Sequence, residues 1–267
     1  MAKLSISQAW DETRLILARD GKLIAAVALA LFVLPGIVLN VAVPKMPTGQ
    51  MREPGAWMLI AFAVLLITLI GQLAIVRLSL APHIAVGEAI THGARRLGSY
   101  VGAFLLWSVP LLAIGSFLYT MSNPQSPNPS VPAALGLLAV TALGVFISVR
   151  LILLSAVASA ESGGPIAILQ RSWELSRGNW WRLFGFAVML LIAAMVAIWA
   201  VSAVIGVIAR LAFGDLTPLS IGGLIVVIVG QLLSAVISVI LLVMIARLYS
   251  QRTGAASAQA SVPSSGI

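Results

Sequence analysis

The sequence predicts an all-α polytopic membrane protein whose six transmembrane helices form three hairpin repeats. Two observations predict the membrane location. Of the residues, 60% are hydrophobic and 9% are charged, and several charge-free apolar runs exceed the roughly 20 residues that cross a bilayer as a helix. A third observation predicts the repeat: a Glu follows 11 residues after an Arg that ends an apolar stretch, at Arg77 to Glu88 and again at Arg150 to Glu161.

The composition argues against several other classes of protein. A soluble fold with this composition would expose more apolar surface than water tolerates. There is no Cys, and the two His residues, His83 and His92, are too few for a His-built site, so we expect no metal and no cofactor. The net charge of +8 comes from basic residues that flank apolar spans, where they meet lipid headgroups, and nucleic-acid binding is therefore not expected.

Six apolar spans follow one another, separated by short loops rich in Pro, Gly and polar residues. We predict spans at residues 22–43, 57–77, 100–121, 132–154, 183–209 and 219–248. They form a single six-span membrane domain over residues 1–252. Residues 253–267, which are rich in Ser, Ala and Gly, are predicted to be a disordered C-terminal tail.

The distribution of Lys and Arg predicts the orientation. Thirteen of the 16 basic residues lie on the side of both termini, and Lys45, Arg52 and Arg210 lie on the other side. Short loops rich in Lys and Arg remain in the cytoplasm. We therefore expect a multi-pass protein of the bacterial inner membrane with both termini in the cytoplasm.

Three amphipathic segments precede the odd-numbered spans, at residues 5–19, 86–97 and 165–182. On a helical wheel each separates an apolar face from a polar face. In the third segment Trp173 lies on the apolar face, Arg171 and Arg177 flank the polar face, and Trp180 and Trp181 add interfacial anchors. We expect all three to lie along the membrane surface as helices. The alternative is that they are ordinary juxtamembrane turns.

The even-numbered spans also resemble one another. They end in IVRLSL, SVRLIL and IARLYS, around Arg77, Arg150 and Arg247. In the first two, Gly71 and Gly144 stand six residues before the Arg. The repeated unit predicts an interfacial helix, a span, an external turn and a second span, arranged three times in parallel.

Arg77 and Arg150 each precede several further apolar residues. One interpretation is a site for a lipid phosphate, bounded by Trp180 and Trp181, to which other cations would contribute: Arg95, Arg171 or Arg182. The alternatives are snorkelling to the surface or ion pairs with Glu88 and Glu161. We favour the ion pairs, because an Arg that is partly removed from water needs a counter-ion.

The segment GGPIAILQRSWELSRGNWWRLFG resembles a pattern in bacterial proteins related to the membrane domain of glycerophosphoryl diester phosphodiesterase. The matching residues are Glu161, Gly164, Pro165, Ala167, Arg171, Ser172, Trp173, Leu175, Gly178, Trp181 and Leu183. In that family the membrane domain can be fused to a soluble catalytic barrel. This sequence contains no such barrel, so the resemblance implies kinship with the membrane domain and no phosphodiesterase activity.

The residues themselves also argue against an enzyme. Hydrolysis of a phosphodiester needs a metal held by carboxylates, or a His base with an orienting acid. The residues that come closest to this requirement are Glu88 and His92, which lie four residues apart on one helical face beside Arg95 and Arg96. That spacing is common on solvated faces, so we expect no catalytic residue.

The sequence therefore predicts a non-enzymatic inner-membrane protein that binds or organises lipid headgroups or a membrane partner through its cytoplasmic interfacial helices. Its expected partners are membrane lipids, with a membrane protein or a second copy of the chain as further options. The structural or lipid-contact candidates are Arg77, Glu88, Arg150, Glu161, Arg171, Trp173, Arg177, Trp180 and Trp181.

The alternative function is a transporter of a small solute or a lipid, with a polar path between the repeats. Buried polar groups within spans are expensive and often functional, and Gln72 and Gln231 are such groups. A continuous cavity that reaches either Gln would favour the transporter. A closed apolar bundle would favour the lipid-binding protein.

Overall fold

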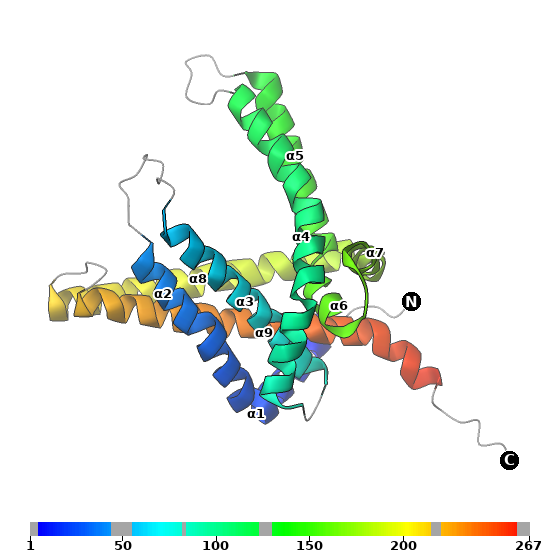
Figure 1. The fold of residues 1–267 in the computed structure, drawn as a ribbon, viewed down its shortest axis with the longest axis horizontal. Coiled ribbons are helices and arrows are strands. Elements are labelled where there is room, and N and C mark those ends of the chain that lie inside the picture. Colours follow the sequence, from blue (N-terminus) through cyan, green and yellow to red (C-terminus); the bar gives the residue numbers. More distant parts are fainter. Residues whose placement is uncertain (1–4, 44–54, 82–83, 123–129, 215–219, 261–267) are drawn as a thin grey trace.

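The computed structural model describes residues 5–43, 55–81, 84–122, 130–214 and 220–260, which form helices and no strand (Figure 1). The elements are α1 (Ile6–Ala28), the π-helical η1 (Leu29–Val33), α2 (Leu34–Ala42), α3 (Trp57–Leu80), α4 (Val86–Ser122), α5 (Val131–Arg150), α6 (Leu154–Ala160), α7 (Pro165–Ser176), α8 (Trp180–Phe213) and α9 (Ile221–Ala260). Within these residues, six helical stretches are long and apolar enough to cross a membrane: Ile6–Ala42, Trp57–Leu80, Val86–Ser122, Val131–Ala160, Trp180–Phe213 and Ile221–Gly254. The predicted all-α, six-span fold is confirmed, and the chain is an integral membrane protein.

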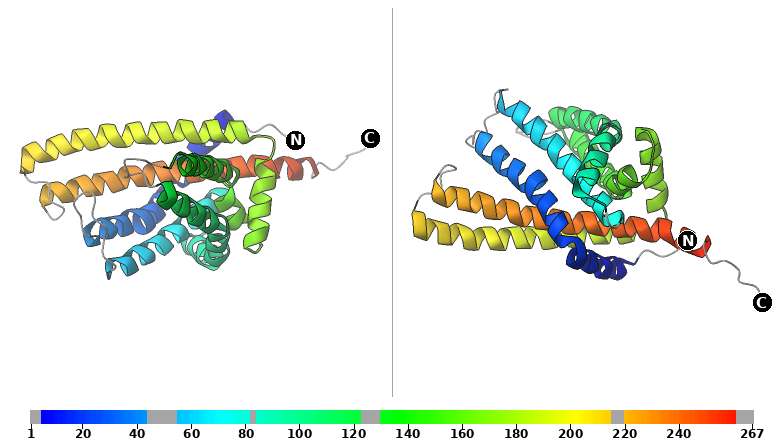
Figure 2. Two further views of the ribbon diagram at one scale, coloured as in Figure 1. Left: turned by 90° about the horizontal axis from the view of Figure 1, so that it is seen from above. Right: turned by 60° about the horizontal axis from the view of Figure 1, so that its bottom comes forward.

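Three helical hairpins, α2–α3, α4–α5 and α8–α9, meet at one end of the molecule and diverge at the other (Figure 1, Figure 2). The meeting point, here called the junction end, contains α6, α7, the first turns of α1 and the C-terminal half of α9. Two hydrogen bonds join the start of α1 to α9: the Ser5 N–H donates to Gln251 Oε1 at 3.2 Å, and Gln251 Nε2 donates to the Ser5 carbonyl at 3.3 Å. Both ends of the six-span unit therefore lie on the same side.

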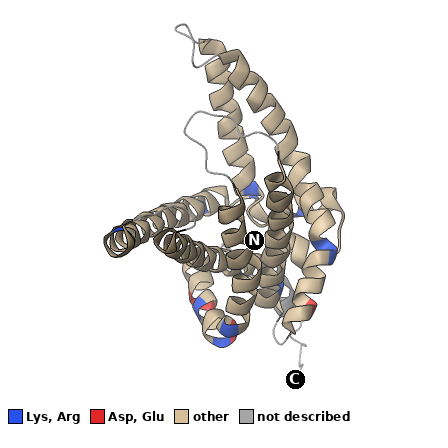
Figure 3. Cartoon of the chain, turned by 60° about the vertical axis from the view of Figure 1, so that its left-hand side comes forward, with Lys and Arg blue, Asp and Glu red and all other residues tan. Residues whose placement is uncertain are grey.

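The hydrophobic core lies at the junction end, where α3, α6 and α9 pack together. Four consecutive residues of α3, numbered 73–76, are fully buried, and so are Val157 of α6 and Val243 of α9. The diverging arms expose apolar side chains, as helices that face lipid do, and the most apolar stretch of α8 has no buried residue. Figure 3 shows Lys, Arg, Asp and Glu gathered around the junction end, with few on the arms.

The amphipathic segments are built differently from one another. The first continues through η1 into α2, because the π-turn over residues 29–33 lets the helix pass Pro35 without ending. The second is the first part of α4, which runs unbroken into the third span. Only the third, α7, is a separate helix; it ends at Ser176, and Gly178 turns the chain toward α8 with φ of 82°, a conformation that other residues rarely adopt. All three predicted amphipathic segments are helical, and the first two are the first parts of helices that also form spans.

The matched ends of the even spans also differ. The helices α3 and α9 continue past Arg77 and Arg247, whereas α5 ends at Arg150 and the chain turns before α6 begins at Leu154. A Cβ on Gly71 would lie 2.7 Å from the Phe32 ring, while a Cβ on Gly144 would meet nothing within 4 Å. The three hairpins are thus present, but equivalent sequence positions have different surroundings.

The loops between the predicted spans and the predicted C-terminal tail are described only in part. The loops that carry the Pro and Gly punctuation, at 44–54, 123–129 and 215–219, lie outside the described residues. Helix α9 extends into the segment 253–267, for which the sequence predicts disorder, and residues 261–267 lie outside the described part.

Candidate functional site

Arg150 lies in an aromatic cluster at the C-terminal end of α5. Its guanidinium carbon is 5.4 Å from the centroid of the Phe146 ring and 5.1 Å from that of Trp173 on α7. These cation–π contacts stabilise a charge that is partly removed from water. The Nε and Nη1 atoms of Arg150 are buried and have no hydrogen-bond partner among the described residues. The site therefore holds a cation with unused donors.

The cluster is fixed by contacts between α5, α7 and α8. The Trp180 indole N–H donates to the Phe146 carbonyl at 3.3 Å, and the Trp180 ring stacks on Phe184 with centroids 4.9 Å apart. The Ser172 hydroxyl of α7 donates to the Arg150 carbonyl at 3.4 Å. The neighbouring Trp181 is 77% exposed. This arrangement suits interfacial anchoring, because one indole is held by protein while the next is free to meet headgroups.

Glu161 pairs with Arg171 and not with Arg150. Arg171 Nε donates to Glu161 Oε1 at 3.1 Å, and the Tyr249 hydroxyl of α9 donates to the same oxygen at 2.8 Å. The hydrogen bond to Glu161 raises the pKa of the Arg171 guanidinium above its ordinary value. The predicted ion pair between Arg150 and Glu161 is wrong. The reason is that the seven residues of α6 place about 10 Å of helix between them.

A second group of charges lines a pocket of about 360 Å³ where α3 ends and α4 begins, here called the basic pocket. Its lining residues are Arg77, Ile84, Gly87, Glu88, Thr91, His92 and Arg95. One side of the pocket is held to α6, because His92 Nε2 shares a 2.8 Å hydrogen bond with the Ser159 carbonyl, and the Ser159 hydroxyl donates to the Leu73 carbonyl at 3.1 Å. The pocket thus combines two guanidinium groups and an imidazole with one carboxylate.

Arg77 and Glu88 were predicted to form an ion pair. They line the same pocket, but the ion pairs between described residues join other groups: Arg19 with Asp20, and Arg171 with Glu161 and Glu174. The structure instead brings Arg77 and Arg95 to one pocket, which Trp180 and Trp181 do not line. Arg171 does not line it.

All nine predicted candidates lie at the junction end, in separate groups. The basic pocket contains Arg77 and Glu88, the aromatic cluster contains Arg150, Trp173 and Trp180, and Trp181 packs on Trp180 at 4.7 Å between ring centroids. Glu161 and Arg171 connect α7 to α9 through Tyr249. The Arg177 carbonyl accepts from Arg252 Nη2 at 3.5 Å, so this residue contributes its backbone to the junction.

Sequence reasoning missed an open-sided cavity of about 400 Å³ between α3, α4, α5, α6 and α9, here called the internal cavity. It reaches Gln72, one of the two Gln residues weighed for transport. The other, Gln231, packs closely against Gly36 of α2. A Cβ on Gly36 would overlap the Gln231 Oε1 atom. The indole of Trp107 also lines the cavity; a polar ring in the middle of an apolar span is the signal that could have pointed to it.

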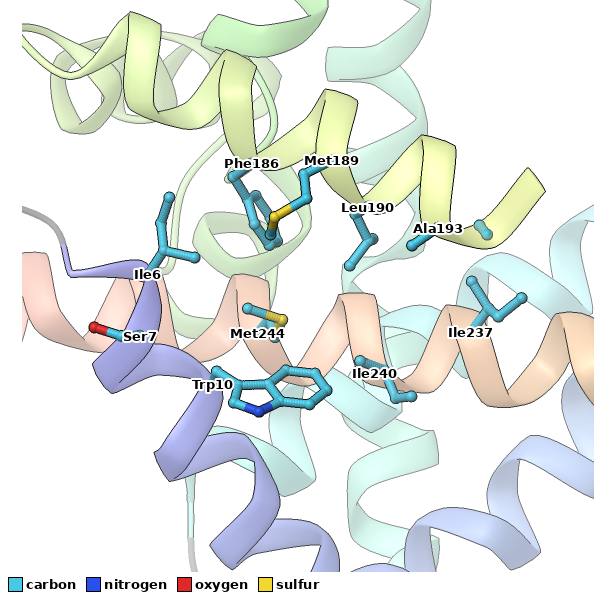
Figure 4. Close-up of a pocket in the computed structure, with 11 residues that line it drawn as sticks. Ile6, Ser7, Trp10, Phe186, Met189, Leu190, Ala193, Ile237, Ile240 and Met244 are labelled. Carbon is cyan, nitrogen blue, oxygen red and sulfur yellow. The ribbon is translucent and has the colours of Figure 1, made fainter. Parts of the chain in front are cut away.

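An apolar groove of about 580 Å³ lies between α1, α8 and α9 (Figure 4). Trp10 from α1, Met189 from α8 and Met244 from α9 point toward it, and among the described residues that line it Ser7 alone carries a hydroxyl group. The groove has the character of a surface that acyl chains cover in a bilayer. We treat it as part of the lipid-facing surface.

A family model described as "Domain of unknown function (DUF7847)" matches residues 4–252. The chain belongs to this DUF7847 family. The match includes the basic pocket, the aromatic cluster and the internal cavity, so all three are features of the DUF7847 domain of this chain. No curated protein and no solved structure matches the chain.

The ion pair between Glu161 and Arg171 can be tested by mutation. In double-mutant cycles, Glu161→Gln and Arg171→Gln should couple by about 0.5–1 kcal/mol, the range for a partly exposed pair. Glu161→Gln and Arg150→Gln should be additive within about 0.5 kcal/mol, because those two groups do not touch. The free energy of unfolding in detergent micelles measures both. Coupling to Arg150 larger than coupling to Arg171 would contradict the observed pairing.

Proposed function

We propose that this integral membrane protein binds anionic lipid headgroups at its junction end, on the cytoplasmic face of a bacterial inner membrane, and catalyses no reaction. The basic pocket is the observation that carries the proposal. Its two guanidinium groups share the lining with a single carboxylate, Glu88, so the pocket has an excess of hydrogen-bond donors and positive charge. Guanidinium groups bind phosphate oxygens with two parallel hydrogen bonds, and a headgroup phosphate supplies those acceptors.

The depth of these groups supports a lipid over a soluble anion. Arg77 lies in the last turn of a spanning helix and Arg150 ends another. Residues at that position meet headgroups, and anionic lipids concentrate at the cytoplasmic surface. The bias of Lys and Arg toward the side of the termini supports the cytoplasmic orientation of this end.

The orphaned donors of the junction end support the same proposal. The Nε atoms of Arg150, Arg247 and Arg252 and the Nη1 atom of Arg150 are buried without hydrogen-bond partners in the described part of the chain, while Nη2 of Arg247 and of Arg252 donate to backbone carbonyls. A buried cation whose donors are unused is costly unless an anion approaches it. In this proposal Trp173 of α7 and Trp181 of α8, which are exposed, anchor the edge of the site. We also propose that the chain is related to the membrane domain of glycerophosphoryl diester phosphodiesterases, because the segment 161–183 resembles a pattern in that family.

The test is a lipid titration of the full chain. Phosphatidylglycerol and phosphatidylcholine are added to detergent-solubilised protein, and bound lipid is counted by native mass spectrometry. Arg77→Gln and Arg95→Gln should each weaken phosphatidylglycerol binding about fivefold, since an Arg near an anionic headgroup contributes about 1 kcal/mol. The loss should shrink as salt increases.

Arg96→Gln is the matched control, because Arg96 neighbours Arg95 on α4 but does not line the pocket. It should leave phosphatidylglycerol binding within twofold of the unmodified protein. Equal effects of Arg95→Gln and Arg96→Gln would indicate a diffuse surface charge and no pocket. Equal binding of the two lipids by the unmodified protein would refute the proposal.

The transporter of a small solute or lipid is the second candidate function. The internal cavity that reaches Gln72 favours it, because polar side chains on the wall of a space between spans are what such a path requires. In proteoliposomes, transport would be recognised as uptake that Gln72→Leu abolishes and Gln231→Leu leaves intact, since Gln231 packs between helices.

A further inference from the structure

The internal cavity exists because α5 stops at Arg150. The chain turns over residues 151–153 and then forms α6, which leaves a space between the α4–α5 hairpin and α9. The turn places Ser148 of α5 and Ser155 of α6 on the wall of this space. Gln72 of α3 and Ser238 of α9 complete the wall from the other hairpins.

Most polar groups of this wall lack a partner among the described residues. The indole Nε1 of Trp107 is buried without a hydrogen-bond acceptor. The Ser148 hydroxyl donates to the Gly144 carbonyl at 2.8 Å. The remaining polar side chains of the wall form no hydrogen bond with a described residue: Gln72, Tyr100, Ser155 and Ser238. Unpaired polar groups in the apolar part of a membrane protein are costly, which points to a ligand that pairs with them.

The chemistry of the wall limits that ligand. No Asp, Glu, Lys, Arg or His lines the cavity, so a phosphate or an ammonium group would lack a counter-ion there. The Gln72 amide offers two donors and one acceptor, the hydroxyls offer both roles, and the indole offers a donor only. The rest of the lining is apolar, for example Phe104 and Leu241. A volume of about 400 Å³ lies within the range of small-molecule sites.

We propose that this cavity is a binding site for an uncharged ligand that combines hydroxyl or carbonyl groups with an apolar body. The glycerol-ester region of a membrane lipid has this chemistry, and so does a small neutral ester or polyol. The site is separate from the basic pocket, which has a different lining and selects negative charge. The indole of Trp107 and the amide of Gln72 orient the ligand by hydrogen bonds to its oxygens.

The experiment uses the full chain labelled with 5-fluorotryptophan and studied by ¹⁹F NMR in detergent micelles. Trp107→Phe assigns the Trp107 signal. Three probes are titrated: 1-monooleoylglycerol for the lipid source, 1-monobutyrylglycerol for the soluble source, and dioleoyl phosphatidic acid as the charged counterpart. A neutral probe should shift the Trp107 signal in a saturable way. The signal of Trp199, which is 74% exposed on α8, should follow only the bulk micelle.

Gln72→Leu and Ser238→Ala are the test variants. Each should weaken binding of the neutral probe, Gln72→Leu by about tenfold, the value of one good hydrogen bond in a buried site. A ligand-binding role also predicts that Gln72→Leu keeps or raises the melting temperature of the unliganded protein, because it removes an unpaired amide. A purely structural role for Gln72 predicts a lower melting temperature.

The outcomes separate the sources of the ligand. Binding of the monooleoyl probe alone identifies a lipid, and binding of the monobutyryl probe identifies a small solute; either supports the proposal. It is overturned if no neutral probe shifts the Trp107 signal up to its solubility limit, if the shift survives both Gln72→Leu and Ser238→Ala, or if phosphatidic acid is the only probe that binds.

Discussion

Gly71→Leu should strongly destabilise the protein, whereas Gly144→Leu should leave its stability almost unchanged. A Cβ at position 71 would lie 2.7 Å from the Phe32 ring and 2.8 Å from the Leu31 Cβ, and both neighbours belong to η1. A leucine adds three further carbons to that contact, so α3 and η1 must separate. Overpacking of this kind costs about 1–3 kcal/mol and more where the backbone must shift. The melting temperature in detergent micelles measures the effect.

Gly144 provides the control, because it occupies the matched position six residues before Arg150 and has nothing within 4 Å of a Cβ. Leucine there gains helix propensity of up to about 1 kcal/mol relative to glycine, so the melting temperature should stay the same or rise. Equal destabilisation by both substitutions would show that the two repeats have the same packing. That result would contradict the environments seen in the structure.

Reporter fusions should give opposite signals on the two sides of the hairpins. We expect an all-or-none difference, because each apolar span carries the chain across the membrane and the excess of Lys and Arg sets the direction. Alkaline phosphatase is active outside the cytoplasm, and fusions should be active at Gly49, Asn128 and Asp215. Green fluorescent protein folds in the cytoplasm, and fusions should be fluorescent at Ala81, Gly163 and Gly254.

Each position carries both reporters, so every fusion has an internal control for expression. A fluorescent fusion at Asn128 would contradict the crossing of the membrane by α4 and α5. A fully inverted pattern would keep the six spans but place the basic pocket on the outer side of the membrane. The proposal of cytoplasmic lipid binding would then fail, while the internal cavity would be unaffected.

Local properties of the chain determined the membrane fold. Hydropathy and length alone predicted six spans, and the same six helices occur in the structure. The segment around Pro165 and Trp173 was predicted as an amphipathic helix and is α7. Continuity of α1 and of α4 was missed, because amphipathic and apolar patterns can follow one another along a single helix with no signal that ends it.

Only the tertiary structure decided which groups meet. The partners of Glu161 include Tyr249, which is 88 positions away in the sequence, and His92 bonds to the carbonyl of a residue 67 positions away. Arg150 and Glu161 share a spacing with Arg77 and Glu88, yet the turn after α5 separates the first pair and the α3–α4 junction brings the second pair to one pocket. Burial and charge pattern act along one helix and can be read from the sequence. The hydrogen-bond partners of each side chain, the basic pocket and the internal cavity depend on how the three hairpins pack against one another. The residue pattern of one hairpin contains no information about where the other two hairpins lie.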